Sequence, residues 1–357
     1  MKKIVSFLLT LIICVSLVSC NEKENSSSAE TLSSATTSEA VSEANGDVNS
    51  FENSETVSEE ASEESSEEEQ ASTPALFKVS DENGNYAWLF GSIHIGDDRF
   101  YPLPEYVESA FEEADALAVE FDVIAFQNNY MEMINAMSLM VYQDGSIISE
   151  NIDPEIYQDA VKILAENGVY SAEYEYYIPS FWSDLISEII YDKLKVDLNN
   201  GVDKTLLRKA KKALKPIYDV ESAEIQFGMM ANYSDELQEY LLKSAIEDYN
   251  EFVTDETEFI NELDKMCDAW ASGNIDAIRE ILNEEPEEFE SDEEKLLYEE
   301  YNKAMMTDRD KHMVEYTKDV IASGETVFIC VGAAHVLGET GMIYQLEQAG
   351  YTVEQVK

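Results

Sequence analysis

The chain carries the same pattern of apolar and polar positions twice. In residues 86–95 and again in residues 327–336, a β-prone apolar run ends in Gly-x-x-His followed by an aliphatic residue. Each copy continues into an apolar stripe at helical spacing and then a second β-prone run, in residues 103–121 and 339–356. Because strand and helix patterns alternate in this order, each copy predicts a β–GxxH–α–β unit.

The long stretch between the two units is mainly helical in pattern. Residues 125–323 place apolar side chains at helical spacing and carry favourable cap residues, while residues 215–220 allow one short strand. The sequence therefore predicts an α/β fold with a split core of two β–GxxH–α–β units, residues 76–124 and 324–357. A large, mainly helical insertion, residues 125–323, separates the two halves of this core.

The first 75 residues are not expected to join this fold. Residues 1–19 have a positive start and an apolar run too short for a transmembrane helix, which is typical of a signal peptide. Leu17-Val18-Ser19-Cys20 resembles a bacterial lipobox, so we expect cleavage before Cys20 and a lipid on its sulfur; an ordinary signal peptide or an uncleaved anchor is the alternative. Residues 20–75 are rich in Ser and Glu, which predicts a lipid-anchored, acidic, disordered tether before the folded domain of residues 76–357.

Charge and composition narrow the choice of partners. The formal net charge is −52 at pH 7, and residues 76–357 are strongly negative even without the tether. Such a surface repels phosphate backbones, so nucleic acid is not expected as a partner. Only Cys267 and Cys330 lie in the predicted domain, too few for a disulfide framework. The chain has three His, of which His312 is expected on a helix surface.

The other two His occupy the same place in the two units. The carboxyl ends of parallel strands meet at one edge of a sheet, so His94 and His335 are expected to converge there. Glu120 lies late in a strand between apolar neighbours, an unfavourable place for an unpaired charge. Two imidazoles and a carboxylate are a common ligand set for a divalent metal, so these three residues are the candidate ligands. The alternatives are hydrogen-bonded structural His residues and an exposed strand-end Glu.

These motifs resemble those of the TraB/PrgY/GumN family, in the superfamily that includes Tiki. The resemblance covers nearly all of residues 76–357 and departs from the usual pattern at Val220, where Leu is usual, and at Asp310, where Asn is common. The motifs that carry it are Gly91-Ser92-Ile93-His94, Val119-Glu120-Phe121-Asp122, Gly201-Val202-Asp203, Asp219-Val220-Glu221-Ser222, Thr307-Asp308-Arg309-Asp310 and Gly332-Ala333-Ala334-His335.

The resemblance implies a metal-dependent, metalloprotease-like hydrolase that acts on a peptide or small molecule. Together with the lipobox-like residues 17–20, this predicts an enzyme held to the membrane by a lipid anchor and acting outside the cytoplasm. In that interpretation Glu120 or Glu221 takes a proton from a metal-bound water, and Arg309 stabilises the developing oxyanion. The simpler alternatives are an N-cap for Asp203, a helix-start residue for Glu221 and a surface ion pair for Arg309. A second function stays open: a binding protein that sequesters a peptide signal or haem, with the His pair as haem ligands.

Overall fold

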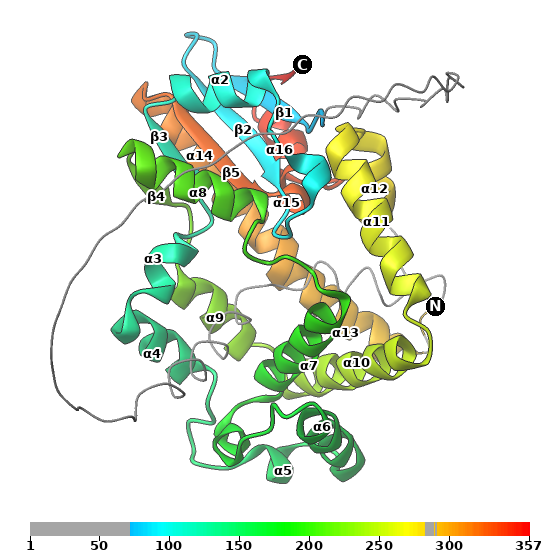
Figure 1. Cartoon of the computed structure of the whole chain (residues 1–357). Helices are drawn as coiled ribbons and strands as arrows, with labels where there is room; N and C mark the ends of the chain where they lie inside the picture. Colours follow the sequence, from blue (N-terminus) through cyan, green and yellow to red (C-terminus); the bar gives the residue numbers. More distant parts are fainter. Residues whose placement is uncertain (1–71, 283–288, 290) are drawn as a thin grey trace, which may run out of the picture. The chain divides into compact units, whose positions relative to one another are not determined.

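A six-stranded mixed sheet organises the part of the chain that the computed structural model describes, residues 72–282, 289 and 291–357 (Figure 1). In the sheet, β2, β5, β3 and β4 run parallel, and β1 is antiparallel to both of its neighbours. The carboxyl ends of four parallel strands therefore lie at one edge. The strands in spatial order are β4 (Ile217–Asp219), β3 (Ala116–Val119), β5 (Val327–Gly332), β2 (Tyr86–Ser92), β1 (Leu76–Ser80) and β6 (Thr352–Val356).

This arrangement confirms the predicted α/β fold class, in which both ends of the domain contribute to one sheet and a helical insertion separates them. Strands β2 and β5 are direct neighbours, and in their register Gly91 pairs with Val331 and Ser92 with Gly332. The two Gly-x-x-His motifs therefore begin side by side, although their His residues are far apart in the sequence.

Side chains of the parallel strands alternate between two apolar cores. Phe90 and Phe328 face one side of the sheet with α2 and α8, whereas Leu89 and Ile329 face the other side with α14 and α16 (Figure 1). Both faces are covered, which explains why β2, β3 and β5 are almost continuously apolar in sequence. The covering helices are α2 (Glu105–Glu113), α8 (Val202–Ala213), α14 (Arg309–Ser323) and α16 (Met342–Gln348).

The predicted insertion is not one helical block, because the chain returns to the sheet within it. After β3 the chain forms α3 to α7, comes back through α8 to the edge strand β4, leaves again as α9 to α13, and returns through α14. The remaining helices are α3 (Val123–Gln127), α4 (Tyr130–Leu139), α5 (Ile148–Asn151), α6 (Pro154–Glu166), α7 (Pro179–Leu194), α9 (Ala223–Ala231), α10 (Asp235–Thr254), α11 (Thr257–Ser272), α12 (Ile275–Leu282) and α13 (Asp292–Asn302), with short 3-10 turns η1 (Asp98–Phe100) and η2 (Ala172–Tyr176) and a π-helical turn η3 (Lys303–Asp308).

The N-terminal predictions concern residues that the structure does not describe. The signal peptide, the lipid site at Cys20 and all but the last few residues of the tether lie outside the described residues. Among the described helices, none has both the length and the apolar character that a membrane span requires.

The two Gly-x-x-His motifs are alike in sequence but differ in conformation. His94 lies in an irregular loop after β2, whereas His335 lies in the short helix α15 (Ala333–Leu337). Neither Gly91 nor Gly332 has a positive φ. A β-carbon on Gly91 would lie only 2.9 Å from the α-carbon of Ala333. The first glycine is thus needed because the α15 backbone packs directly on β2, not because the chain turns through the left-handed region.

We expect Gly91→Ala to lower the free energy of unfolding by about 1–3 kcal/mol, because the new methyl group meets backbone atoms that cannot move aside easily. Urea unfolding followed by circular dichroism measures this. Gly228→Ala is the matched control: it lies within α9, where the nearest atom to a new β-carbon is 3.9 Å away. The control should stabilise the protein by about 0.5–1 kcal/mol. A Gly91→Ala protein as stable as the wild type would contradict the close packing of α15 on β2.

Candidate functional site

Four of the predicted site residues follow the carboxyl ends of the four parallel strands. His94 comes after β2, Glu120 after β3, Glu221 after β4 and His335 after β5. A β-carbon at Gly332 would lie 3.3 Å from Oε1 of Glu120, 3.6 Å from Cδ2 of His335 and 3.9 Å from Nε2 of His94. The three candidate metal ligands therefore converge on one point, which stays open because residue 332 has no side chain.

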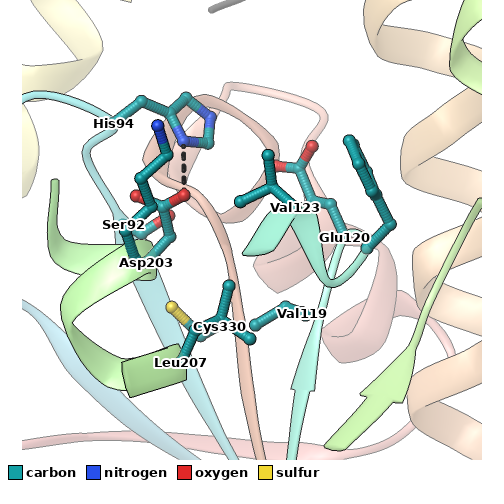
Figure 2. Close-up of a pocket in the computed structure, with 10 residues that line it drawn as sticks. Ser92, His94, Val119, Glu120, Val123, Asp203, Leu207 and Cys330 are labelled. Carbon is teal, nitrogen blue, oxygen red and sulfur yellow. Dashed lines mark ion pairs between the residues drawn. The ribbon is translucent and has the colours of Figure 1, made fainter. Parts of the chain in front are cut away.

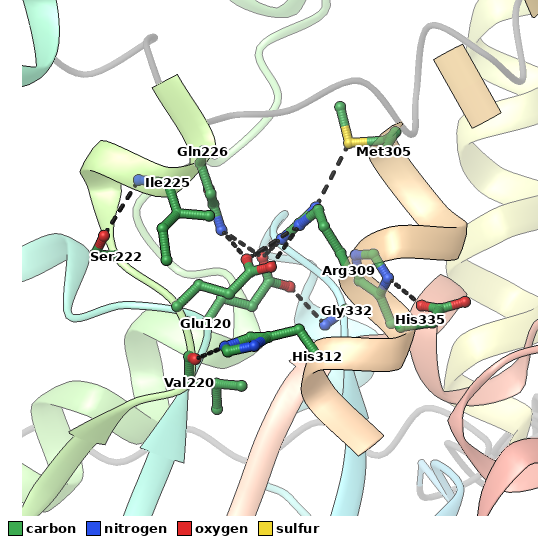
Figure 3. A network of polar contacts seen from close by, with 12 residues as sticks. Glu120, Val220, Ser222, Ile225, Gln226, Met305, Arg309, His312, Gly332 and His335 are labelled. Atoms are coloured by element: carbon green, nitrogen blue, oxygen red, sulfur yellow. Dashed lines mark hydrogen bonds and ion pairs between the residues drawn. The ribbon is translucent and has the colours of Figure 1, made fainter. Parts of the chain in front are cut away.

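A carboxylate orients each of the two imidazoles. Nδ1 of His335 lies 2.7 Å from Oδ1 of Asp310, and both side chains are buried (Figure 3). Nδ1 of His94 lies 3.3 Å from Oδ2 of Asp203, and the His94 side chain is 39% exposed (Figure 2). Pairing at Nδ1 leaves Nε2 of each ring for a ligand, the arrangement common among metal-binding His residues. The contact of Asp310 with His335 was not predicted from the sequence; its signal was the place of Asp310 next to Arg309 in the motif of residues 307–310.

Asp203 reaches His94 because two loops join through their backbones. The N–H of Val202 donates to the carbonyl of Ile93 at 2.9 Å. A β-carbon at Gly201 would collide with the carbonyl group of His94, so only glycine lets the start of α8 approach this closely. The N-cap of α8 is Gly201, with no side-chain cap. The N-cap alternative for Asp203 is therefore wrong, and its carboxylate is left to pair with the imidazole.

Arg309 is buried between two carboxylates (Figure 3). Its Nε and Nη2 donate to Glu221 at 2.8 to 3.0 Å, and Nη2 also donates to Glu120 at 2.7 Å. Gln226 donates to both carboxylates, at 2.9 and 3.2 Å. The remaining nitrogen, Nη1, lies 3.5 Å from the sulfur of Met305, which is a weak acceptor. Glu221 thus fixes the guanidinium, and Nη1 keeps the capacity to donate to a stronger acceptor.

These neighbours shift the pKa values within the site. Burial favours the neutral form of Glu120, but Arg309 and the two imidazoles outweigh burial and hold the pKa of Glu120 well below its usual range. Burial also opposes a charge on His94, yet the carboxylate of Asp203, helped by Glu120, raises the pKa of His94 to about 9. Burial raises the pKa of Asp310 against the opposing effect of His335. In the absence of another cation, His94 therefore carries a proton at neutral pH and Glu120 does not.

The donor set suits a divalent cation. Four carboxyl groups outnumber the two cationic groups, the guanidinium and the protonated imidazole of His94, so the cluster attracts positive charge. An incoming metal ion would replace the proton on Nε2 of His94, and Nε2 is a usual metal donor of His. In residues 72–282 and 291–357, no three His, Cys, Asp or Glu side chains are already spaced to hold one ion. His94, Glu120 and His335 would hold an ion only by drawing together around the open point at Gly332. The four carboxyl groups belong to Glu120, Asp203, Glu221 and Asp310.

Two cavities meet at His94 and Glu120. The smaller one extends toward Asp203 and Cys330 beneath α8 (Figure 2). The larger one also includes His335 and Arg309 and extends among apolar side chains of α11, α12 and η3. Glu221 lines neither of these two cavities. The site residues that line these cavities are therefore His94, Glu120, His335 and Arg309. Glu221 lies outside the cavity lining and contacts Arg309.

Two helix surfaces make contacts near the site. His312 is exposed on α14, as expected, but its Nε2 lies 2.7 Å from the carbonyl oxygen of Val220, next to Glu221 (Figure 3). A basic residue of α8 also makes an internal contact. Lys211 pairs with Asp122, which caps α3 beside Glu120. Both helix surfaces therefore support the carboxyl edge of the sheet.

Comparison with known proteins identifies the family. Residues 75–355 match the sequence model of the TraB/PrgY/gumN family. The chain belongs to this family. The resemblance of the motifs to those of TraB/PrgY/gumN proteins is thus confirmed over nearly the whole described domain.

Two curated relatives of this TraB/PrgY/gumN protein are both described as uncharacterized protein YbaP. The one from Shigella flexneri is 28% identical over 152 residues, which cover 42% of this chain and 53% of the relative. The one from Escherichia coli (strain K12) is 28% identical over 149 residues, which cover 41% of this chain and 52% of the relative. The chain spans about half the length of the curated relatives it matches. No solved structure matches the chain.

We expect Asp203→Asn to lower the pKa of His94 by about one unit or more in the metal-free protein, because the neighbouring carboxylate is what stabilises the imidazolium. Nuclear magnetic resonance can follow the titration, since the chain has only three His. Asp159→Asn, on the exposed face of α6, is the matched control and should leave all three titrations unchanged. An unchanged His94 titration in a folded Asp203→Asn protein would show that the pair does not form in solution.

Proposed function

We propose that this TraB/PrgY/gumN protein is a divalent-metal-dependent hydrolase that cleaves peptide or other amide bonds. One observation carries the proposal: two imidazoles, each held at Nδ1 by a carboxylate, converge with Glu120 on an open point at the carboxyl edge of the sheet. Ligands of open α/β sheets bind at this edge. A metal-binding His commonly has its other ring nitrogen held by a carboxylate, as both imidazoles do here.

The metal ligands in this proposal are Nε2 of His94, Nε2 of His335 and a carboxylate oxygen of Glu120. A divalent ion bound there would lower the pKa of a water molecule and polarise a carbonyl group. Asp203 and Asp310 hold the two rings in the tautomer that presents Nε2. Their removal should affect the orientation of the rings more than the fold.

The two acidic residues proposed as catalytic, Glu120 and Glu221, have different roles. Glu120 lines both cavities, so of the two carboxylates it is the one that a water molecule in the cavities can reach and pass a proton to. Glu221 lines neither of them, and its side chain is only 1% exposed in its contact with Arg309. We therefore assign to Glu221 the task of positioning Arg309, whereas the proton transfer belongs to Glu120.

Arg309 is the proposed stabiliser of the oxyanion. Nε and Nη2 are held by the carboxylates, while Nη1 has the sulfur of Met305 as a weak partner on the side of the larger cavity. A fixed donor aimed at the position where negative charge develops is worth more than one that must reorient. The carbonyl oxygen of a substrate lying beside Met305 would be within the range of this donor.

We expect His94→Ala, Glu120→Ala and His335→Ala each to lower metal-dependent hydrolysis by at least about a hundredfold while the protein stays folded, because each removes a ligand of the proposed ion. Cleavage of a peptide library, metal content and circular dichroism should be measured together. Glu236→Ala, an exposed residue in the first turn of α10, is the matched control for the Glu variant. His312→Ala is not a silent control, because His312 contacts the backbone next to Glu221.

The same assays separate hydrolysis from sequestration. Folded site variants that remain as active as Glu236→Ala would show that the site is misassigned. If the wild type binds a peptide tightly, or gives a Soret band after haem addition, but turns over no peptide with any divalent metal, the binding function replaces the hydrolytic one.

We also propose that the mature protein is held to the membrane by a lipid on Cys20, with the domain outside the cytoplasm. The support is the lipobox-like sequence at residues 17–20, followed by an acidic, Ser-rich tether that suits an extended spacer. Asn21 after Cys20 is not an obvious retention signal, so the proposal names no particular layer of the envelope.

We expect the wild type to partition with membranes and to incorporate an alkyne-labelled fatty acid, and Cys20→Ala to lose the label and remain unprocessed or be released. Cys267→Ala is the control and should keep the label, because Cys267 is buried within α11. Fractionation and in-gel fluorescence measure both effects. A wild type that is fully soluble after signal cleavage would contradict the lipid anchor.

A further inference from the structure

The larger cavity has an apolar part that the proposed chemistry does not use. We infer that this part, here called the apolar chamber, binds a large neutral apolar side chain of the peptide substrate, such as Leu or Phe, next to the bond that is cleaved. The cleavage itself rests on the proposed function, whereas the recognition of the side chain follows from the chamber.

Two helices present matching apolar faces to the chamber. Met266, Ala269 and Trp270 of α11 recur at spacings of three and four residues, and three apolar residues of α12 beginning at Ile278 follow the same spacing. Residues at these spacings share one helix face. Figure 1 shows α12 beside α15, the helix that carries His335, and α11 packs against α12. The two faces therefore form continuous apolar walls that end at the site.

The π-helical turn η3 links the chamber to the site. Met305 and Met306 line the chamber from this turn, and Arg309 follows one helical turn later. Single π-helical turns inside α-helices are frequent at functional sites. Figure 3 shows the sulfur of Met305 directed at Arg309, so the apolar wall begins directly beside the proposed oxyanion donor.

The chamber has a rigid interior and an adaptable mouth. Trp270 is 3% exposed and its indole N–H donates to the carbonyl of Gly91 at 2.8 Å, which fixes its ring against the strand that leads to His94. Met266 and Met306 are only partly buried. Flexible thioether side chains at an opening adjust to apolar groups of different shape. This combination suits several large apolar side chains rather than one.

Charge around the chamber excludes acidic side chains. Glu262, partly exposed on α11, is the carboxylate that lines the chamber away from the ligand cluster. The chain as a whole is strongly negative. An acidic side chain would therefore meet like charge at the mouth and lose its hydration among apolar walls. A neutral apolar side chain has no charge to desolvate, and removing its apolar surface from water stabilises the complex.

The test uses the full chain, the double variant Met266→Gln/Met306→Gln and the matched control Met131→Gln, an exposed residue of α4 outside the cavity. The Gln side chain keeps the length of Met but is polar. Two readouts are needed: cleavage of peptides that differ only by Leu, Phe, Ser or Asp beside the scissile bond, and binding of the neutral fluorescent probe N-phenyl-1-naphthylamine. Binding of the probe measures the affinity of the chamber for an apolar group and does not require cleavage of a substrate.

We expect the wild type to cleave beside Leu or Phe with a kcat/KM at least about tenfold above that beside Ser, and the double variant to lose most of this preference while cleavage beside Ser changes less than about twofold. Probe binding should weaken by about tenfold in the double variant and stay unchanged in Met131→Gln. Ala269→Leu, which fills the chamber, should lower cleavage beside Phe more than beside Ser.

The two possible failures are distinguishable. Equal cleavage beside Leu and Ser, or probe binding that the double variant leaves unchanged, overturns the assignment of the chamber and leaves the hydrolase intact. If the wild type cleaves a fatty-acyl ester with a higher kcat/KM than every peptide, the assignment of a peptide as the substrate is overturned. If no peptide is cleaved but the double variant loses probe binding, the hydrolase fails and the apolar recognition site stands.

Discussion

The ion pair of Arg309 with Glu120 and Glu221 is the contact on which the carboxyl edge of the sheet depends. One guanidinium joins the ends of β3 and β4 to the start of α14. Removing one partner from a buried pair of this kind typically costs about 3–5 kcal/mol, because the remaining charge stays buried. The next residue, Asp310, orients His335. Since neighbouring residues of a helix point in different directions, two consecutive positions organise two different parts of the site.

Much of the fold follows from local sequence pattern. Strands buried on both faces require nearly continuous apolar runs, so β2, β3 and β5 were recognisable, and their parallel order brought His94 and His335 together as expected. The sequence signal for strand β4 was weaker, because a three-residue strand at the edge of a sheet is too short to show a clear apolar pattern. The helical form of α15 was not foreseen, because the same Gly-x-x-His letters suit a loop in one copy and a helix in the other.

The contacts behind the ligands were harder to predict because they join distant segments. Gln226 bonds to both carboxylates of the ion pair, yet nothing around it in the sequence marks it. Asp203 looks locally like a helix cap, but the approach of Gly201 to the His94 loop gives its carboxylate a different partner. In both cases the tertiary contact prevailed over the local preference. Sequence pattern thus placed the residues that face the cavities better than those that support them.

The order of the site residues along the chain has a consequence for how the protein matures. The first three hundred residues supply both carboxylates of the ion pair, but the guanidinium and the second imidazole come only with Arg309 and His335. A nascent chain that lacks its final segment therefore holds acidic groups at the sheet edge without their cation, and β5 is missing from between β2 and β3. The groups of the site are consequently brought together only after residues 309–335 have been synthesised, so a chain that stops before them lacks the guanidinium and the second imidazole.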